Sequence, residues 1–177
     1  MLTLPFPDKR VMQICWVVPD LHAAIDAWVR KTGVGPFFYF DKVQFEDGRY
    51  RGAPAQMVDH AAAIGQAGEM QIELVCQTVD QPSIWRDVAP AGETRLHHIA
   101  IYCDDYQATR DAYTGAGAEV AYEGLMMGHR TCWLDTTASL GFMIELITRN
   151  PVAEAVFGQI RDAAVDWDGK DPIRTLS

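Results

Sequence analysis

The sequence predicts an α+β fold in which two βαβββ units pair into an open, barrel-like sheet. Two observations carry this prediction. Strand-like and helix-like segments follow one another in the order β, α, β, β, β twice along the 177 residues. The segments that open and close the first unit also align without gaps with those of the second. Such internal repetition indicates a duplicated structural unit.

The first unit is expected over residues 11–78. Its opening segment is an apolar, strand-like run that ends at Pro19, and Asp20 has the side chain of a helix N-cap. Apolar residues then recur at helical spacing until Gly33, which is suited to end the helix. The expected strands lie at residues 11–18, 36–45, 55–64 and 69–77, with turns at 47–48 and 65–68.

The second unit is expected over residues 96–149, after a loop-rich linker at 79–95. It opens with a strand that ends at two aspartates, continues as a helix up to Gly115, and closes with three strands. These strands are expected at residues 119–122, 131–135 and 142–148. In the C-terminal region 150–177, helical spacing predicts a helix from 151 to 167 that packs outside the core, followed by a frayed tail.

The repeat aligns at both of its ends. Residues 13–20 align with residues 98–105, so that Gln13 corresponds to His98 at an offset of 85 positions. Residues 70–75 align with residues 142–147, so that Glu73 corresponds to Glu145 at an offset of 72 positions. The first unit is therefore longer than the second between its first and last strands.

Composition excludes several classes of function. The chain is 49% hydrophobic and 22% charged, which is enough apolar material for a core, and its net charge is −9. No apolar run is long enough to cross a membrane, and residues 1–10 lack a stretch of signal-peptide length. We therefore expect a soluble, cytoplasmic protein that binds neither nucleic acid nor membranes. The four cysteines form no C-x-x-C pair and are expected to be reduced, half-buried thiols.

Four polar residues occupy equivalent points of the repeat, each within an otherwise apolar strand. They are Gln13, Glu73, His98 and Glu145. A carboxylate inside a sheet is costly unless it is paired or binds a metal. If the units pair about a pseudo-twofold axis, the four side chains converge and offer one nitrogen and three oxygen-bearing groups. Such a set suits a divalent ion such as Zn²⁺, Ni²⁺, Co²⁺ or Mn²⁺. The sequence thus predicts a metal site enclosed by the barrel-like sheet.

Three further histidines are weighed as site residues. His97 is expected to face away from the cavity by strand alternation, in a structural or supporting role. His60 is expected to be solvated, with a position facing the cavity as the alternative. His129 lies at a turn, where it and Arg130 form a candidate pocket rim for an anionic substrate. A set of aromatic and methionine side chains is expected mainly in the core, with a subset lining an apolar substrate cavity; the set comprises Phe37 to Phe40, Tyr102, Met126, Met127 and Trp133.

Four phrases of the sequence, QICWVVPDL, LHHIAIYCDDY, IELVCQ and FMIELI, resemble the vicinal oxygen chelate superfamily over residues 11–148. They are most similar to its glyoxalase-like and methylmalonyl-CoA epimerase-like branches. In this family the metal ligands come from the first and last strand of each unit, which maps them onto the four polar residues. The resemblance implies a metal-dependent isomerase or lyase that abstracts a proton from a small substrate with vicinal oxygens, through a metal-stabilised enediolate. Glu145 is the expected base, with Glu73 as the second candidate.

Two other functions are compatible with this fold. A non-catalytic protein would sequester an apolar compound, as resistance proteins do, but such proteins usually lose the ligand set that this chain keeps. An extradiol dioxygenase would need two histidines and one carboxylate around iron, and Gln13 stands where many members have the first histidine. The resemblance also implies a homodimer that acts on a small-molecule substrate.

Overall fold

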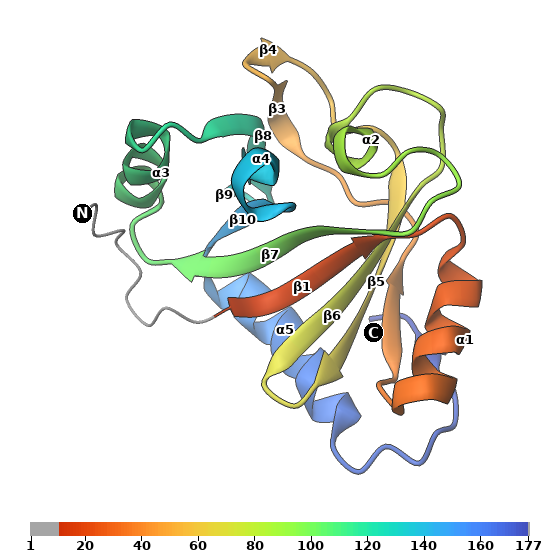
Figure 1. Cartoon of the computed structure of the whole chain (residues 1–177). Helices are drawn as coiled ribbons and strands as arrows, with labels where there is room; N and C mark the ends of the chain where they lie inside the picture. Colours follow the sequence, from red (N-terminus) through yellow and green to blue (C-terminus); the bar gives the residue numbers. More distant parts are fainter. Residues whose placement is uncertain (1–10, 177) are drawn as a thin grey trace.

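The computed structural model describes residues 11–176, and its strands form one open sheet (Figure 1). The expectation about residues 1–10 lies outside the described residues. The strands are β1 (Val11–Val17), β2 (Phe37–Phe40), β3 (Glu46–Tyr50), β4 (Ala53–Pro54), β5 (His60–Ala67), β6 (Met70–Gln77), β7 (Arg95–Cys103), β8 (Glu119–Met126), β9 (His129–Asp135), β10 (Met143–Thr148) and β11 (Ile173–Arg174). The helices are α1 (Leu21–Thr32), α2 (Ile84–Val88), α3 (Tyr106–Gly115), α4 (Thr137–Leu140) and α5 (Pro151–Ala164).

The two halves of the sheet repeat one topology and meet at β1 and β7. These antiparallel neighbours run side by side through the middle of Figure 1. β1 pairs in parallel with β6, and β7 pairs in the same way with β10. The strand order is β11-β2-β5-β6-β1-β7-β10-β9-β8-β3-β4, so that β2-β5-β6-β1 in one half corresponds to β8-β9-β10-β7 in the other. The predicted α+β fold of paired βαβββ units is confirmed.

The hairpin of β3 and β4 accounts for the greater length of the first unit. It leaves its own half of the sheet and pairs with β8 at the far edge, where Tyr50 lies opposite Tyr122. The turn predicted at 47–48 lies inside β3, at an irregularity where Asp47 adopts a left-handed conformation with φ of 49°. Gly48 fits there because a Cβ would overlap the Tyr122 hydroxyl group. The first unit therefore reaches across the sheet to the second.

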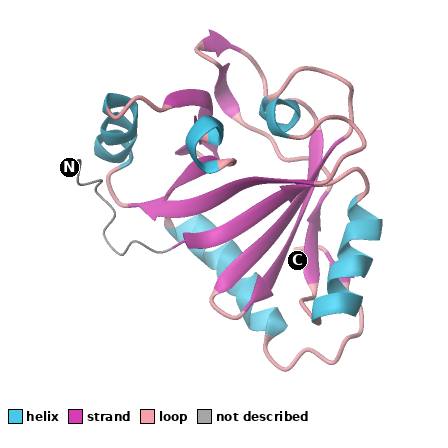
Figure 2. Ribbon diagram, viewed as in Figure 1, coloured by secondary structure: helices cyan, strands magenta, loops and turns pink. Residues whose placement is uncertain are grey.

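The two helices of the repeat begin at aspartates. Asp20 Oδ1 accepts a hydrogen bond from Ala23 N at 3.0 Å, and Asp105 Oδ1 accepts one from Ala108 N at 2.9 Å. Gly33 ends α1 in the left-handed conformation that glycine adopts without strain. α1 and α3 lie to the sides of the sheet in Figure 2 and pack on the apolar side chains of one face, here called the outer face.

The opposite face, here called the inner face, carries α2 and α5. Ile160 of α5 is fully buried and packs with Phe38 of β2 and Ile64 of β5. The expectation that the C-terminal helix packs outside the core is therefore wrong, because its apolar stripe meets the inner face. The expected frayed tail instead pairs through β11 with β2, where Ile173 lies opposite Phe37. Within residues 11–176, no helix has the length and apolar content needed to cross a bilayer.

Candidate metal centre

Strand register brings the four predicted site residues to the middle of the sheet. Cys15 of β1 lies opposite Glu73 of β6 on one side and opposite His98 of β7 on the other. Ala100 of β7 lies opposite Gln13 of β1 on one side and opposite Glu145 of β10 on the other. Each unit thus contributes two polar residues to neighbouring positions, one from its first strand and one from its last.

Glu73, His98 and Glu145 form a compact group on the inner face. His98 Nε2 lies 3.0 Å from Glu145 Oε2 and 3.4 Å from Glu73 Oε2, and the ligand atoms of all three lie within 4.8 Å of one another. His98 is fully buried and Glu145 nearly so, whereas the Glu73 side chain is 15% exposed. The Thr131 hydroxyl shares its proton between Glu145 Oε1 at 3.1 Å and the Leu146 carbonyl oxygen at 2.9 Å. One carboxylate oxygen is thereby held in place.

Gln13 is held by a second glutamine on the neighbouring strand. Gln13 Nε2 donates to Gln71 Oε1 at 3.1 Å, and both side chains are buried. Because the amide nitrogen is engaged, the amide oxygen of Gln13 is the atom available to a ligand. Gln13 lines the same cavity as Glu73 and Glu145.

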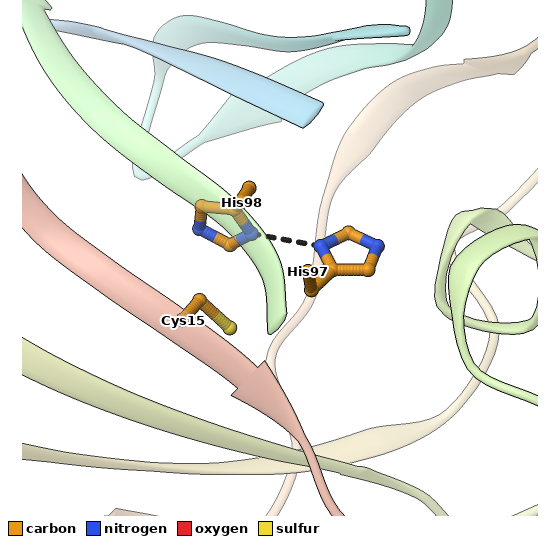
Figure 3. Close-up of side chains that lie close together, drawn as sticks. All are labelled: Cys15, His97 and His98. Carbon is orange, nitrogen blue, oxygen red and sulfur yellow. Dashed lines mark hydrogen bonds between the residues drawn. The ribbon is translucent and has the colours of Figure 1, made fainter. Parts of the chain in front are cut away.

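A chain of hydrogen bonds fixes the proton on the His98 ring (Figure 3). His97 Nε2 lies 2.9 Å from the Ile84 carbonyl oxygen, which can only accept, so His97 Nε2 carries a proton. His97 Nδ1 lies 2.9 Å from His98 Nδ1, and one proton bridges these two nitrogens. Burial lowers the pKa of His97 well below its ordinary value, and the charge of His98 adds to this effect. A neutral His97 accepts at Nδ1, so His98 Nδ1 donates, and His98 Nε2 is the ring nitrogen that faces the carboxylates and would bind a cation in place of its proton.

The indole of Trp133 adds a longer contact to the same ring nitrogen. Trp133 Nε1 lies 3.3 Å from His98 Nδ1. Since that nitrogen already donates its proton to His97, it has no lone pair for the indole N–H. We therefore interpret this contact as packing of the Trp133 edge against the imidazole.

His97 takes part in this chain because β7 contains a bulge. Cys15 pairs with His98 and the next residue, Trp16, pairs with Leu96, so His97 is an extra residue in the ladder. The expectation that His97 faces away from the cavity side is therefore wrong, because strand alternation holds only for a regular strand. Its expected supporting role agrees with the contact to the His98 ring.

The donor set fits a divalent cation. His98 Nε2 is buried without a hydrogen-bond partner, because its approaches to the two carboxylates lack hydrogen-bond geometry. Burial alone would lower the pKa of His98, but the Glu145 and Glu73 carboxylates raise it to about 9. Burial raises the pKa of Glu145, and the neighbouring His98 opposes this shift. A cation at this place would satisfy the orphaned nitrogen and offset two buried negative charges.

A second group of potential ligands, which shares His98 with the first, consists of Cys15, His97 and His98 (Figure 3). Burial raises the pKa of the Cys15 thiol well above its ordinary value, and the negative charge of Glu73 adds to this effect. The sulfur is therefore protonated in the metal-free protein. Both nitrogens of His97 are also engaged in hydrogen bonds. Of the two groups, the one that contains Glu73 and Glu145 is the candidate metal centre.

An apolar cavity adjoins this centre, with about 700 Å³ of empty space that includes its opening to solvent. Its lining includes Gln13, Glu73 and Glu145. His129 and Arg130, the candidate rim residues, are not among the lining residues in the described part of the chain. Of the aromatic and methionine set, the cavity is lined by Phe40, Met126, Met127 and Trp133.

Sequence reasoning missed several other lining residues. His60 lines the cavity and is 3% exposed, so the expectation of a solvated side chain is wrong and the alternative of a position facing the cavity is confirmed; its ring packs against Phe45 and Trp85. Trp85 of α2 also lines the cavity, although its segment is loop-rich in sequence. Ser83, whose Oγ accepts from Arg86 N at 3.2 Å, is a capping signal that identifies this short helix. The helix α5 contributes Ala153, Val156 and Phe157.

Comparisons with known proteins agree with this fold. The model of the Glyoxalase/Bleomycin resistance protein/Dioxygenase superfamily matches residues 12–133. No curated protein sequence gives a significant match. A solved methylmalonyl-CoA epimerase in complex with methylmalonyl-CoA and NH₄⁺ is 22% identical at a TM-score of 0.57, over 85% of this chain and 98% of that one. The methylmalonyl-CoA epimerase from Mycobacterium tuberculosis is 16% identical at a TM-score of 0.57, over 82% and 91% of the two chains. These identities show a shared fold.

Proposed function

Because the chain belongs to the Glyoxalase/Bleomycin resistance protein/Dioxygenase superfamily, we propose that it is a metal-dependent isomerase or lyase acting on a small substrate with vicinal oxygens. The observation that carries this proposal is the compact group of Glu73, His98 and Glu145. In this group a histidine nitrogen without a hydrogen-bond partner faces two carboxylates. With the amide oxygen of Gln13, these side chains form the proposed ligand set.

Each part of the site has a proposed role. A divalent ion bound here would polarise the oxygens of the substrate and stabilise the negative charge that develops when a neighbouring proton leaves. His98 and Gln13 are proposed as metal ligands. The side chain of each is oriented by a hydrogen bond to a neighbouring side chain. The apolar walls offer few hydrogen-bond partners to water, which reduces competition from solvent for the proton.

We propose Glu145 as the base that removes the proton, with Glu73 as the second candidate. Glu145 is the more buried of the two carboxylates, and Thr131 holds one of its oxygens. A fixed and dry carboxylate is the better general base, because its geometry toward the substrate is set before the reaction begins. The partly exposed Glu73 is proposed mainly as a ligand that supplies negative charge.

Metal content is the first test. We expect one divalent ion per chain in protein purified without chelators, measured by elemental analysis, and loss of that ion in His98→Ala. A chain that takes up none of Zn²⁺, Ni²⁺, Co²⁺ or Mn²⁺ would contradict the proposal. That result would favour a protein of this fold that sequesters an apolar compound.

Proton exchange is the second test. 2-Hydroxyacetophenone carries vicinal oxygens and an exchangeable proton between them, and its exchange in D₂O is followed by proton NMR. The metal-loaded protein is expected to accelerate this exchange, and Glu145→Gln is expected to abolish the acceleration while the fold is kept. Glu119→Gln removes a carboxylate whose side chain is 81% exposed and serves as the matched control. Undiminished exchange in Glu145→Gln would rule out this base.

A further inference from the structure

We infer that the cavity selects substrates whose vicinal oxygens are attached to an uncharged, apolar body such as an aryl group. This inference rests on the proposed function, because it takes the oxygens to face Glu73, His98 and Glu145. It concerns the remaining walls of the cavity, which decide what else the substrate carries.

Apart from the indole N–H groups of two tryptophans, the polar groups of the cavity lining belong to the candidate ligands and one histidine. Of its 17 lining residues, the polar ones are Gln13, His60, Glu73 and Glu145. His60 Nδ1 lies 2.9 Å from the Val58 carbonyl oxygen, and burial lowers the pKa of this ring, so it stays neutral. Within the described chain, neither lysine nor arginine lines the cavity. A second anionic group on the substrate would therefore lose its hydration without gaining a cationic partner.

The helix α5 supplies one apolar wall. Ala153, Val156 and Phe157 line the cavity, and Ile160 anchors the helix on the inner face. These positions follow the spacing i, i+3, i+4, i+7, so one continuous stripe of the helix faces the sheet. The N-terminal part of this stripe lines the cavity, and its C-terminal part packs in the hydrophobic core.

Aromatic side chains form another part of the wall. The ring centroids of Trp133 lie 5.6 Å from Phe45 and 5.9 Å from Trp85, in edge-to-face arrangements. All three side chains line the cavity. Aromatic groups arranged in this way offer both edges and faces to a further ring.

Met127 indicates that the wall extends to the protein surface. This residue lines the cavity although it is 54% exposed. With Gly128 it forms the turn between β8 and β9, where its φ of 53° is a conformation that favours glycine or asparagine. The apolar lining of the cavity therefore continues to its mouth at the protein surface.

Three hydroxamates test this inference, because they present the same pair of chelating oxygens and differ in the attached body. Acetohydroxamate carries a methyl group, benzohydroxamate a phenyl ring, and 4-carboxybenzohydroxamate a phenyl ring with a second anionic group. Affinity for the Co²⁺-loaded protein is measured by calorimetry and referred to the affinity of each compound for free Co²⁺. We expect the phenyl compound to bind at least about tenfold more tightly than the methyl compound, and the carboxylated compound to lose this advantage.

The outcomes separate this inference from the proposed function, because the metal content is measured on the same samples. Equal affinities for the methyl and phenyl compounds overturn the inference alone. So does tightest binding of the carboxylated compound, or no binding by a protein that holds its ion. A protein that takes up no ion and binds no hydroxamate overturns both proposals.

Variants of α5 test whether this helix forms the wall that selects the apolar body of the ligand. Phe157→Ala is expected to narrow the advantage of benzohydroxamate over acetohydroxamate. Val156→Arg places a cation at a half-buried position of the wall, and we expect it to favour 4-carboxybenzohydroxamate over benzohydroxamate. Val152→Ala changes the exposed side of the same helix and is expected to leave all ratios unchanged. Unchanged ratios in both cavity variants, with folding verified by circular dichroism, would overturn the assignment of this wall.

Discussion

Glu73 and Glu145 occupy equivalent positions in the closing strands of the two units, yet their surroundings differ. Glu145 is buried and shares the proton of the Thr131 hydroxyl. The Glu73 side chain is partly open to solvent, and its nearest ring nitrogen is His98 Nε2 at 3.4 Å. The same position of the repeat thus holds a buried, hydrogen-bonded carboxylate in the second unit and a more solvent-exposed carboxylate in the first.

The opening strands differ in the same direction. His98 is fixed by His97, which donates in turn to a backbone carbonyl group. At the position equivalent to His97 the first unit has Met12, whose side chain has no ring nitrogen to accept or donate these hydrogen bonds. Gln13 is held instead by Gln71, a side chain that is replaced by Met143 in the second unit. Each unit therefore supports its own polar residue with a different neighbour.

This comparison teaches that duplication has kept the frame and changed what surrounds the site. The second unit supplies the rigid half of the proposed metal centre, in which the proton positions are fixed by backbone and side-chain partners. The first unit supplies a neutral amide and a partly solvated carboxylate. We therefore expect the second unit to dominate both catalysis and metal affinity, and four predictions test that asymmetry.

The largest expected effect is on proton exchange. Glu145→Gln is expected to slow the exchange of 2-hydroxyacetophenone by roughly 10²–10⁴-fold, the usual contribution of a general base. Glu73→Gln, measured at saturating metal, is expected to slow it less, because the base remains. Equal losses in the two variants would show that the carboxylates are interchangeable and would remove the asymmetry.

The next effect is on metal affinity. His98→Ala removes the single nitrogen donor and is expected to weaken binding of Zn²⁺ by more than about 100-fold, the upper range for residues that only support a ligand. Gln13→Ala removes a neutral oxygen donor and should weaken it less. Competition with a chromophoric chelator measures both affinities. A larger loss in Gln13→Ala would place the dominant ligand in the first unit.

Replacing His97 or Gln71, which hold the proposed ligands His98 and Gln13, should lower metal affinity less than replacing the ligands themselves, and the larger loss is again expected in the second unit. His97→Phe keeps an aromatic ring against Trp85, whose centroid lies 4.6 Å away, but removes the acceptor for His98 Nδ1. We expect metal affinity to fall by roughly 10–100-fold. His97→Gln, which retains an acceptor oxygen, should recover part of the loss. A purely structural role would instead lower thermal stability and leave the affinity of the folded protein unchanged.

The matching change in the first unit is Gln71→Met, which copies the residue at the equivalent position of the second unit. It frees the Gln13 amide to rotate but removes no donor from the site. Its effect on metal affinity should therefore be smaller than that of His97→Phe. A larger effect would mean that the orientation of Gln13 limits metal binding.

The sequence predicted the frame of this fold because the relevant signals are local. Aspartate caps, glycine stops and the alternation of apolar residues are all read within a few positions, and the repeat relates one unit to the other. The repeat pointed to the four polar residues, which lie on the two central strands and on the parallel neighbour of each. Their roles as ligands and base stay predictions.

The misses have non-local causes. The spacing of apolar residues predicted the helix α5, but it did not indicate that the apolar stripe of this helix packs on the inner face of the sheet. The β3–β4 hairpin pairs with a strand about 70 residues away in sequence, which no local pattern indicates. The side chain of His97 does not follow the strand alternation because β7 has a bulge at this residue. The bulge is defined by pairing with β1, in which two consecutive residues pair with His98 and Leu96.

The smallest expected effect tests the symmetric part of the comparison. Asp20 and Asp105 cap equivalent helices with hydrogen bonds of 3.0 and 2.9 Å, and both caps lie at the surface. Replacing either by alanine should lower the free energy of unfolding by about 1 kcal/mol, the usual cost of losing an N-cap. Urea unfolding of Asp20→Ala and Asp105→Ala measures both values. Equal losses, with metal affinity unchanged, would show that the two frames are equivalent and that the asymmetry belongs to the site alone. A change in metal affinity in only one variant would instead mean that its helix helps to position the site.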